Sequence, residues 1–296
     1  MGNQQKQTKH FFEKDANNWS KKSFFPKKNK PLNTIHERNI YVINLIKKNK
    51  LLYHLDVGCG AGDLVFNSSK ITKKSVGIDF ANEMIKIANK KYKKKNLLLE
   101  TKSIFDYSTE LRFDCISANG FIEYLSINEI YNFFKISNKL LKRGGFLTIS
   151  SRNRLFNLFS LNEFSKKEVE GDKFKILYKE ALNCNKSKNL DEFKKFKSNK
   201  ISIINFKQPN TGIKVNIRHQ FTPSQLSFTL KKLGFMITDI HPINYHPVLP
   251  SIYNSEKNYK FFSNDIFKRS FKKNFNKLSN LPFSSSFMIT AKKNKV

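Results

Sequence analysis

The chain has few cysteines and few acidic residues, and it has no long apolar run. Its 296 residues include only three cysteines, none of them in a C-x-x-C pair, which indicates neither a disulfide framework nor a zinc site. No segment approaches the ~18 to 20 consecutive apolar residues of a membrane-spanning helix. The opening residues MGNQQK lack a signal-peptide core, and Lys6 stands where a myristoylation signal needs Ser or Thr. We therefore expect a cytoplasmic protein with no bound metal.

The shortage of acidic residues leaves a strongly basic chain. Only 23 Asp and Glu oppose 55 Lys and Arg, which gives a net charge of +32. A charge of this size usually indicates binding to nucleic acid or to an anionic membrane. Arginine, the residue that forks onto phosphates and bases, is scarce, however, and most of the basic residues are lysines spread along the chain. The sequence therefore favours a general compositional bias, with a nucleic-acid surface as the alternative. The arginines are Arg38, Arg112, Arg143, Arg152, Arg154, Arg218 and Arg269.

The composition indicates a globular protein, with 39% hydrophobic residues and 29 phenylalanines. From residue 51 onward, short apolar runs of strand length alternate with amphipathic helical segments. Repeated strand, helix and strand predict an α/β fold with a mostly parallel sheet covered on both faces. The predicted strands are residues 51–57, 75–78, 96–100, 113–118 and 146–150.

Four regions follow from this pattern. Residues 1–50 are expected to form an N-terminal arm and helices, in which the stretch FFEKDANNW is either a flexible arm or a lid, and a helix begins with a Thr34/Glu37 capping box. Residues 51–150 form the core. The polar residues 151–217 predict an inserted cap or substrate-recognition region. Residues 218–296 return to the core, with a helix capped by Thr222 and two further strands at 235–240 and 285–291.

The stretch LLYHLDVGCGAGDL places three glycines, Gly58, Gly60 and Gly62, directly after an apolar strand and Asp56. Glycines at this point let a helix begin close to a ligand, with backbone N–H groups directed at it. A turn alone would need one glycine or two. A dinucleotide site would show G-x-G-x-x-G instead.

The sequence DVGCGAG resembles motif I of the class I S-adenosylmethionine (SAM)-dependent methyltransferases. The resemblance continues in VGIDFANEMIKIA, where Asp79 lies 21 residues after Gly58, and in FDCISANGFIEYL and LLKRGGFLTIS. It implies a doubly wound seven-stranded sheet, mostly parallel with the last strand antiparallel, and a cap inserted after strand five. Residues 51–150 would then be the SAM-binding core.

The resemblance also implies SAM as the cofactor and assigns its site. Asp56 would order the loop, and Gly58, Cys59, Gly60 and Gly62 would line the amino-acid part of SAM. Asp79 would bind the ribose hydroxyls. The remaining cofactor residues would be Phe80 and Met84 at the adenine, Ser103 at the position where many relatives hold the adenine amino group with Asp, and Asn119 at the methionyl end.

The acceptor site is less defined. The start FFEKDANNW looks like that of quinone methyltransferases, which often carry Glu-His where this chain has Glu123-Tyr124. The candidate catalytic residues are His219, Glu123 and Tyr124. The candidate substrate residues are Arg152, Asn153, Arg154 and Tyr245.

The segment 152–154 has two interpretations. Its arginines could grip a carboxylate or phosphate of the acceptor, or they could pin the inserted region to the core. The favoured function is transfer of a methyl group from SAM to a small-molecule acceptor, at a hydroxyl oxygen, producing S-adenosylhomocysteine. One alternative is an RNA methyltransferase that uses the basic surface, although the sequence SANGF lacks the Asn-Pro-Pro-aromatic run of enzymes that methylate base amino groups. The other is a regulatory protein that binds SAM without catalysis.

Overall fold

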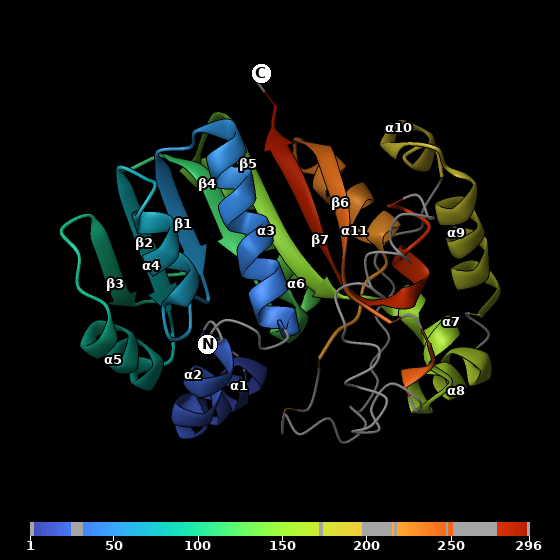
Figure 1. Ribbon diagram of the computed structural model, residues 1–296, viewed down its shortest axis with the longest axis horizontal. Coiled ribbons are helices and arrows are strands. Elements are labelled where there is room, and N and C mark those ends of the chain that lie inside the picture. Colours follow the sequence, from blue (N-terminus) through green and yellow to red (C-terminus); the bar gives the residue numbers. More distant parts are fainter. Residues whose placement is uncertain are drawn as a thin grey trace.

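The computed structural model describes residues 3–24, 32–171, 174–196, 215, 218–246, 248–250 and 277–294. Within these ranges the strands form one seven-stranded sheet in the order β3-β2-β1-β4-β5-β7-β6 (Figure 1). The strands are β1 (Tyr53–Val57), β2 (Lys74–Asp79), β3 (Leu97–Thr101), β4 (Phe113–Ala118), β5 (Leu141–Arg152), β6 (Phe235–Tyr245) and β7 (Ser284–Lys293).

Strands β1 to β5 pair in parallel, and β7 runs antiparallel to both of its neighbours, β5 and β6. The predicted α/β fold and the antiparallel last strand are therefore confirmed. The strand order reverses between β1 and β4, and ligands of open α/β sheets bind at such a switch point, beyond the carboxyl ends of the strands.

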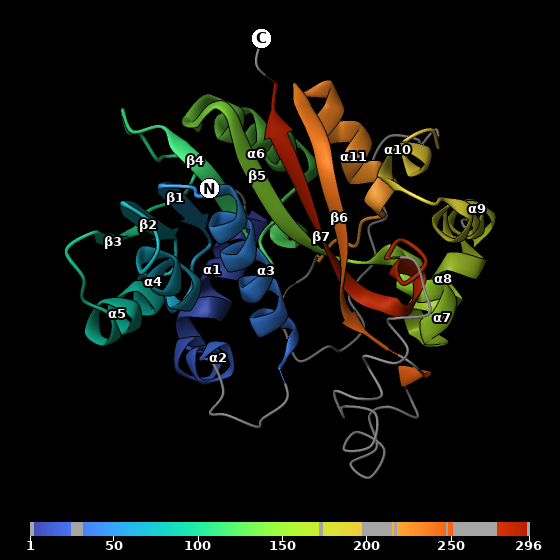
Figure 2. The same ribbon diagram turned by 45° about the horizontal axis from the view of Figure 1, so that its top comes forward.

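Helices cover both faces of the sheet (Figure 1). The helices α3 (Thr34–Asn49), α4 (Asp63–Ser69) and α5 (Asn82–Lys91) lie on one face, and α6 (Ile127–Leu140) and α11 (Pro223–Lys232) lie on the other. Figure 2 shows α1 (Asn3–Lys14) and α2 (Ala16–Ser23) beyond the carboxyl ends of β1 and β4. The region after β5 contains α7 (Asn157–Ser160), α8 (Glu163–Glu170), α9 (Phe174–Lys186) and α10 (Leu190–Phe193).

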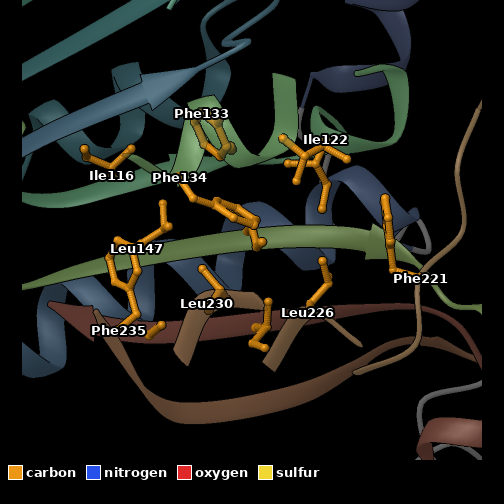
Figure 3. Close-up of a cluster of buried hydrophobic side chains, with 14 of the residues drawn as sticks. Ile116, Ile122, Phe133, Phe134, Leu147, Phe221, Leu226, Leu230 and Phe235 are labelled. Carbon is orange, nitrogen blue, oxygen red and sulfur yellow. The ribbon is translucent and has the colours of Figure 1, made fainter. Parts of the chain in front are cut away.

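The larger core lies between the sheet and the second helical face. Figure 3 shows Phe133 and Phe134 of α6 and Leu226 and Leu230 of α11 gathered around Leu147 of β5. All five side chains are almost fully buried. Burial of one such side chain contributes roughly 1.5 to 3 kcal/mol, so this layer fixes α6 and α11 on the sheet.

Local signals placed some helix starts correctly, but not the end of α6, which we expected at Gly144 and which lies at Leu140, before β5. Thr222 caps α11, as predicted, with Pro223 in its first turn. A Ser126/Glu129 capping box begins α6. The predicted Thr34/Glu37 box is wrong by one residue. Asn33 is the N-cap of α3, because its side chain accepts hydrogen bonds from the backbone N–H groups of Ile35 and His36, and the His36 ring accepts from the backbone N–H of Asn33.

The predicted cap at 151–217 is described only in part, because residues 172–173, 197–214 and 216–217 lie outside the described ranges. Its limits remain a prediction. None of the described helices is long and apolar enough to cross a bilayer.

Candidate active site

The glycine loop joins the end of β1 to the start of α4. Gly60 has φ +53°, a backbone conformation that L residues rarely adopt, and a Cβ there would have no atom closer than Trp19 Nε1 at 3.9 Å. The backbone at Gly60 is thus open to a neighbouring molecule. Gly62, with φ +81°, serves packing instead, since a Cβ there would approach Ala88 Cβ to 3.1 Å.

Asp79 lies at the carboxyl end of β2 and ties two elements of the site together. Its Oδ2 accepts a hydrogen bond from the Gly60 backbone N–H at 2.9 Å, and its Oδ1 accepts one from the Ala81 N–H at 2.9 Å. The side chain is only 8% exposed, and this burial raises the pKa of Asp79 to about 6. The carboxylate therefore holds the glycine loop while it forms part of a cavity wall.

Most of the predicted cofactor residues line one cavity of about 90 Å³. This first cavity lies beyond the carboxyl ends of the parallel strands. The predicted residues on its wall are Gly58, Gly60, Asp79, Phe80, Met84, Ser103 and Asn119. Residues that are distant in sequence are therefore brought together as the resemblance implied.

The N-terminal helices supply another wall of the first cavity, through Phe12 and Trp19. The Phe12 ring meets Trp19 and Tyr124 edge-on, with centroids 5.3 and 5.4 Å away. Gln4 Nε2 also donates to the backbone oxygen of Tyr124 at 2.8 Å. The stretch FFEKDANNW thus packs over the glycine loop as two short helices.

A second cavity of about 390 Å³ adjoins the first, because Trp19, Gly58, Gly60, Asn119 and Tyr124 line both. The predicted residues Asp56, Cys59, Glu123 and Arg152 lie on its wall. So do two arginines that were not assigned to a site from the sequence, Arg38 of α3 and Arg218, which precedes α11.

Glu123 is the acid at the centre of these arginines. Its side chain is 1% exposed, and its Oε2 accepts a hydrogen bond from Arg218 Nε at 2.6 Å. Burial alone would raise the pKa of Glu123, but Arg218, Arg38 and Arg152 together hold it below its ordinary value. Glu123 is therefore an ionised carboxylate. Burial and the charge of Glu123 raise the pKa of Tyr124, which keeps its hydroxyl protonated.

Asp56 lies beneath the loop and bonds to the neighbouring strand. Ser117 Oγ of β4 donates to Asp56 Oδ1 at 2.5 Å. Burial raises the pKa of Asp56 to about 7. The Asp56 side chain thus links β1 to β4 at the switch point of the sheet.

Asn153 and Arg154 are held by protein groups. Asn153 Nδ2 donates to the backbone oxygens of Leu281 and Ser284, at 2.6 and 2.9 Å. Arg154 forms a two-pronged ion pair with Glu168, through Nε at 2.8 Å and Nη2 at 2.6 Å. Both side chains therefore fix the inserted region to the core.

The other two predicted residues also lie apart from the cavities. The His219 backbone N–H donates to the Glu123 backbone oxygen at 2.7 Å, and its ring packs against Phe221. Tyr245 ends β6, opposite Ser284 of β7. Neither residue is on the described wall of either cavity, and neither is Gly62. In the described ranges, no group of three or more His, Cys, Asp and Glu is arranged to hold a metal ion.

The residues that the sequence did not reveal are Arg38, Arg218, Phe12 and Trp19. The two arginines had one usable signal. In a chain that uses lysine almost everywhere, each of the few arginines is a candidate for a position that needs a planar fork rather than a charge alone. Phe12 and Trp19 lie in the stretch FFEKDANNW, which the sequence marked as an arm or a lid without assigning either residue to the site.

Known proteins resemble this chain in sequence over its core. Residues 55–145 match the family described as a methyltransferase domain. A ubiquinone biosynthesis O-methyltransferase of Pelagibacter ubique is 31% identical over 138 residues, which cover 42% of this chain and 57% of that protein. The protein of the same name from Bradyrhizobium diazoefficiens is 27% identical over 127 residues, covering 42% and 48%. The chain therefore spans about half the length of the curated relatives it matches.

Solved structures resemble it in fold over nearly the whole length. The magnesium protoporphyrin IX methyltransferase of Synechocystis PCC 6803 with bound SAM has a TM-score of 0.55 at 11% identity, and the match covers 99% of both chains. A SAM-dependent methyltransferase of Mesorhizobium loti has a TM-score of 0.51 at 10% identity, covering 88% and 100%. Together with the strand order, these likenesses show that the chain has the class I SAM-dependent methyltransferase fold, and residues 55–145 are the part that matches the methyltransferase-domain family.

Proposed function

We propose that this protein transfers the methyl group of SAM to a hydroxyl oxygen of a small molecule. The observation that carries the proposal is the pair of adjoining cavities, which meet at Gly58, Gly60 and Asn119. One cavity has the glycine loop and Asp79 on its wall. The other is larger and lined by charged side chains. Such a pair suits a cofactor and an acceptor that must meet at one point.

The residues of the first cavity fit SAM. The Asp79 carboxylate has oxygens suited to accept hydrogen bonds from ribose hydroxyls, in addition to the two backbone N–H groups that it already holds. Phe80 and Met84 offer apolar surface for the adenine, with Ser103 near its edge. Oδ1 of Asn119 is buried without a partner in the described part of the chain, and it can accept from the ammonium group of the methionyl end.

When bound, SAM supplies a methyl carbon already activated by its sulfonium, so that transfer to oxygen leaves S-adenosylhomocysteine and a methyl ether. The protein's contribution is to position the acceptor and to exclude water. The buried Oε1 of Glu123 has no hydrogen-bond partner among the described residues. We assign it to accept the hydrogen bond of the acceptor hydroxyl and to take its proton as the C–O bond forms, after which Glu123 releases this proton to solvent. Because Tyr124 stays protonated, it can only orient a neighbouring group.

Oxygen is the proposed target because the matched curated relatives are named O-methyltransferases. Neither RNA methylation nor a regulatory SAM-binding role finds support in the comparisons, and we propose neither. His219, Asn153, Arg154 and Tyr245 receive no role in the reaction, since none of them lies on the described cavity walls.

The test combines cofactor binding with product formation. Calorimetric titration with SAM should give saturable binding by the wild-type chain and none by Gly60→Val, because a branched side chain at φ +53° would strain the loop and enter the open space there. Gly171→Val is the matched control, at an exposed glycine with φ −86° that ends α8.

Product formation is then followed with methyl-labelled SAM, in separate reactions with a small-molecule extract and with total RNA. We expect label in an alkali-stable ether that the Gly60→Val chain does not make. Saturable SAM binding with label found only in RNA, or in no product at all, would contradict the proposal.

A further inference from the structure

Three aromatic side chains border the place where the two cavities meet. Trp19 of α2 and Tyr124 of the short helix η1 (Ile122–Tyr124) line both cavities, and Phe12 of α1 lines the first. We call these three rings the aromatic corner. The other described residues on both walls carry neither a ring nor a charge: Gly58, Gly60, Asn119 and Gly120. The shared part of the wall therefore offers aromatic rings but no charged side chain.

The junction is also where the reacting sulfur of SAM must lie. Under the proposed function the methyl group leaves a sulfur in the first cavity and joins an oxygen in the second, so both atoms lie near the boundary between the cavities. The indole of Trp19 is close to this boundary, because its Nε1 lies 3.9 Å from the position of a Cβ at Gly60. The sulfonium of SAM carries a positive charge, whereas the sulfur of S-adenosylhomocysteine is neutral. The rings therefore border the atom at which cofactor and product differ in charge.

The rings of the aromatic corner are arranged as perpendicular walls. The Phe12 ring makes interplanar angles of 83° and 89° with the rings of Trp19 and Tyr124. A cation within about 6 Å of a ring centroid is attracted to the ring, most strongly for tryptophan. Tyr124 already has such a partner, since the guanidinium carbon of Arg218 lies 5.5 Å from its centroid. The cation–π pairs among the described residues involve neither Trp19 nor Phe12, so both rings can take a cation from a bound molecule.

The helices that carry the aromatic corner are anchored to the core. Gln4 Nε2 of α1 donates to the backbone oxygen of Tyr124 at 2.8 Å, and Ser23 Oγ at the end of α2 donates to Asp63 Oδ2 of α4 at 2.9 Å. Between these two anchors, the rings of α1 and α2 pack on a small apolar cluster shared with α5. Rings held in this way lose little conformational freedom when a ligand binds, which favours affinity.

From this geometry we infer that the aromatic corner binds the positive sulfonium of SAM and thereby favours SAM over S-adenosylhomocysteine. The inference rests on the proposed function, because it assigns the rings to the cofactor of that reaction. Aromatic rings suit this group, since a sulfonium has no proton to donate and is attracted to a ring through its charge alone. After methyl transfer the sulfur is neutral and this attraction is lost. The product is therefore released more readily than the cofactor.

The test is calorimetric titration of the full-length protein with SAM, with S-adenosylhomocysteine and with sinefungin, an analogue that carries a protonated amine in place of the sulfonium. The readout is the dissociation constant of S-adenosylhomocysteine divided by that of SAM. Cation–π attraction corresponds to roughly a 2- to 30-fold change in affinity, and Trp19→Leu should lower the ratio by this factor. It should also weaken the binding of sinefungin more than that of S-adenosylhomocysteine. Loss of packing alone would weaken all three ligands alike and leave the ratio unchanged.

Two further variants complete the series. Trp19→Phe keeps a smaller ring and should keep part of the preference for SAM. Phe146→Leu is the matched control, because it removes a partly buried ring that lies under Lys292 in the amino-terminal half of β5 and on neither cavity wall. It should leave the ratio unchanged. The carboxylates of the site also attract a cation, but every variant retains them, so a change in the ratio belongs to the ring.

The melting temperature of each variant shows whether the fold is intact. A ratio that is equal in the wild type and a folded Trp19→Leu chain would overturn the inference. So would sinefungin binding that Trp19→Leu weakens no more than S-adenosylhomocysteine binding, because the preference would then depend on the methyl group rather than on the charge.

The outcomes for the two proposals are distinguishable. If both ligands bind and a methylated small molecule forms, but the ratio does not depend on Trp19, the proposed function stands and this inference fails. If the ratio depends on Trp19 but no methylated small molecule forms, the proposed function fails and the assignment of the rings to the sulfonium holds. If neither SAM nor S-adenosylhomocysteine binds, both fail.

Discussion

Replacing Asp79 with asparagine removes the negative charge of the side chain and keeps its size and shape. In the wild-type chain the carboxylate accepts one backbone N–H on each oxygen, from Gly60 and Ala81, both at 2.9 Å. An amide of the same size has one oxygen, so its NH₂ group must face one of these donors. The loss of one charge-assisted hydrogen bond costs about 1.5 to 3 kcal/mol, and we expect SAM affinity to fall roughly 10- to 150-fold.

The same carboxylate predicts how SAM binding depends on pH. Burial raises the pKa of Asp79 to about 6. Above that pH the group is an ionised acceptor for ribose hydroxyls, and below it the group carries a proton and accepts less well. Wild-type affinity should therefore be constant from pH 7 to 8 and fall as the pH drops through 6. Because asparagine does not titrate, the Asp79→Asn variant should lack this fall.

Calorimetric titration with SAM between pH 5 and 8 measures both effects. Glu83→Gln is the matched control, because it removes one carboxylate from the exposed side of α5, where Lys86 is the ion-pair partner of Glu83 among the described residues. It should bind SAM like the wild type. An Asp79→Asn chain that folds normally and binds SAM within twofold of the wild type would refute the assignment of Asp79 to the cofactor.

Three further measurements test other parts of the structure. Trp19 is the only tryptophan of the chain and lies beside Gly60, so its fluorescence should change saturably when SAM is added; an unchanged spectrum at saturation would contradict its place on the cavity wall. Arg154→Met should lower the free energy of unfolding by about 3 to 5 kcal/mol, because it leaves the charge of the buried Glu168 without its ion-pair partner. Adding Glu168→Leu should restore much of this free energy. Urea unfolding measures the stability of both variants, and their SAM affinity should not change. Burial raises the pKa of Asp56 to about 7, above its value in the unfolded chain. The wild type should therefore lose stability relative to Asp56→Asn as the pH rises from 5 to 7, by at most about 1.4 kcal/mol per pH unit. Stability profiles of the two chains that run parallel over this pH range would argue against this burial.

The fold could be predicted because its signals are local. A strand at 113–118 was predicted from an apolar run, and β4 spans Phe113–Ala118. Glycine after a strand and an acid at the end of the next strand are both signals that a few residues carry by themselves. The capping box of α3 shows the limit of this reasoning. Asn33 and Thr34 are both good caps, and the ring of His36 decided between them.

The acceptor side could not be predicted in the same way. Arg38 and Arg152 are more than a hundred residues apart, and only the sheet brings them to one cavity. Conversely, Arg152 and Arg154 are only two residues apart, yet they have different surroundings. Arg152 lines the second cavity, whereas Arg154 pairs with the buried Glu168. The sequence could not tell a buried structural ion pair from a binding group, because both need the same residue type.

The position of β7 has a consequence for how the protein is made. This strand lies between β5 and β6 in the sheet, yet it begins only at Ser284. During synthesis β5 and β6 are both complete long before their shared neighbour exists, and each presents an unpaired edge in the meantime. Such edges pair readily with other chains. Ser286 on β7 is also the residue that holds Arg38. A nascent chain halted before residue 284 would therefore expose the unpaired, aggregation-prone edges of β5 and β6, and Arg38 would lack its hydrogen-bond partner Ser286.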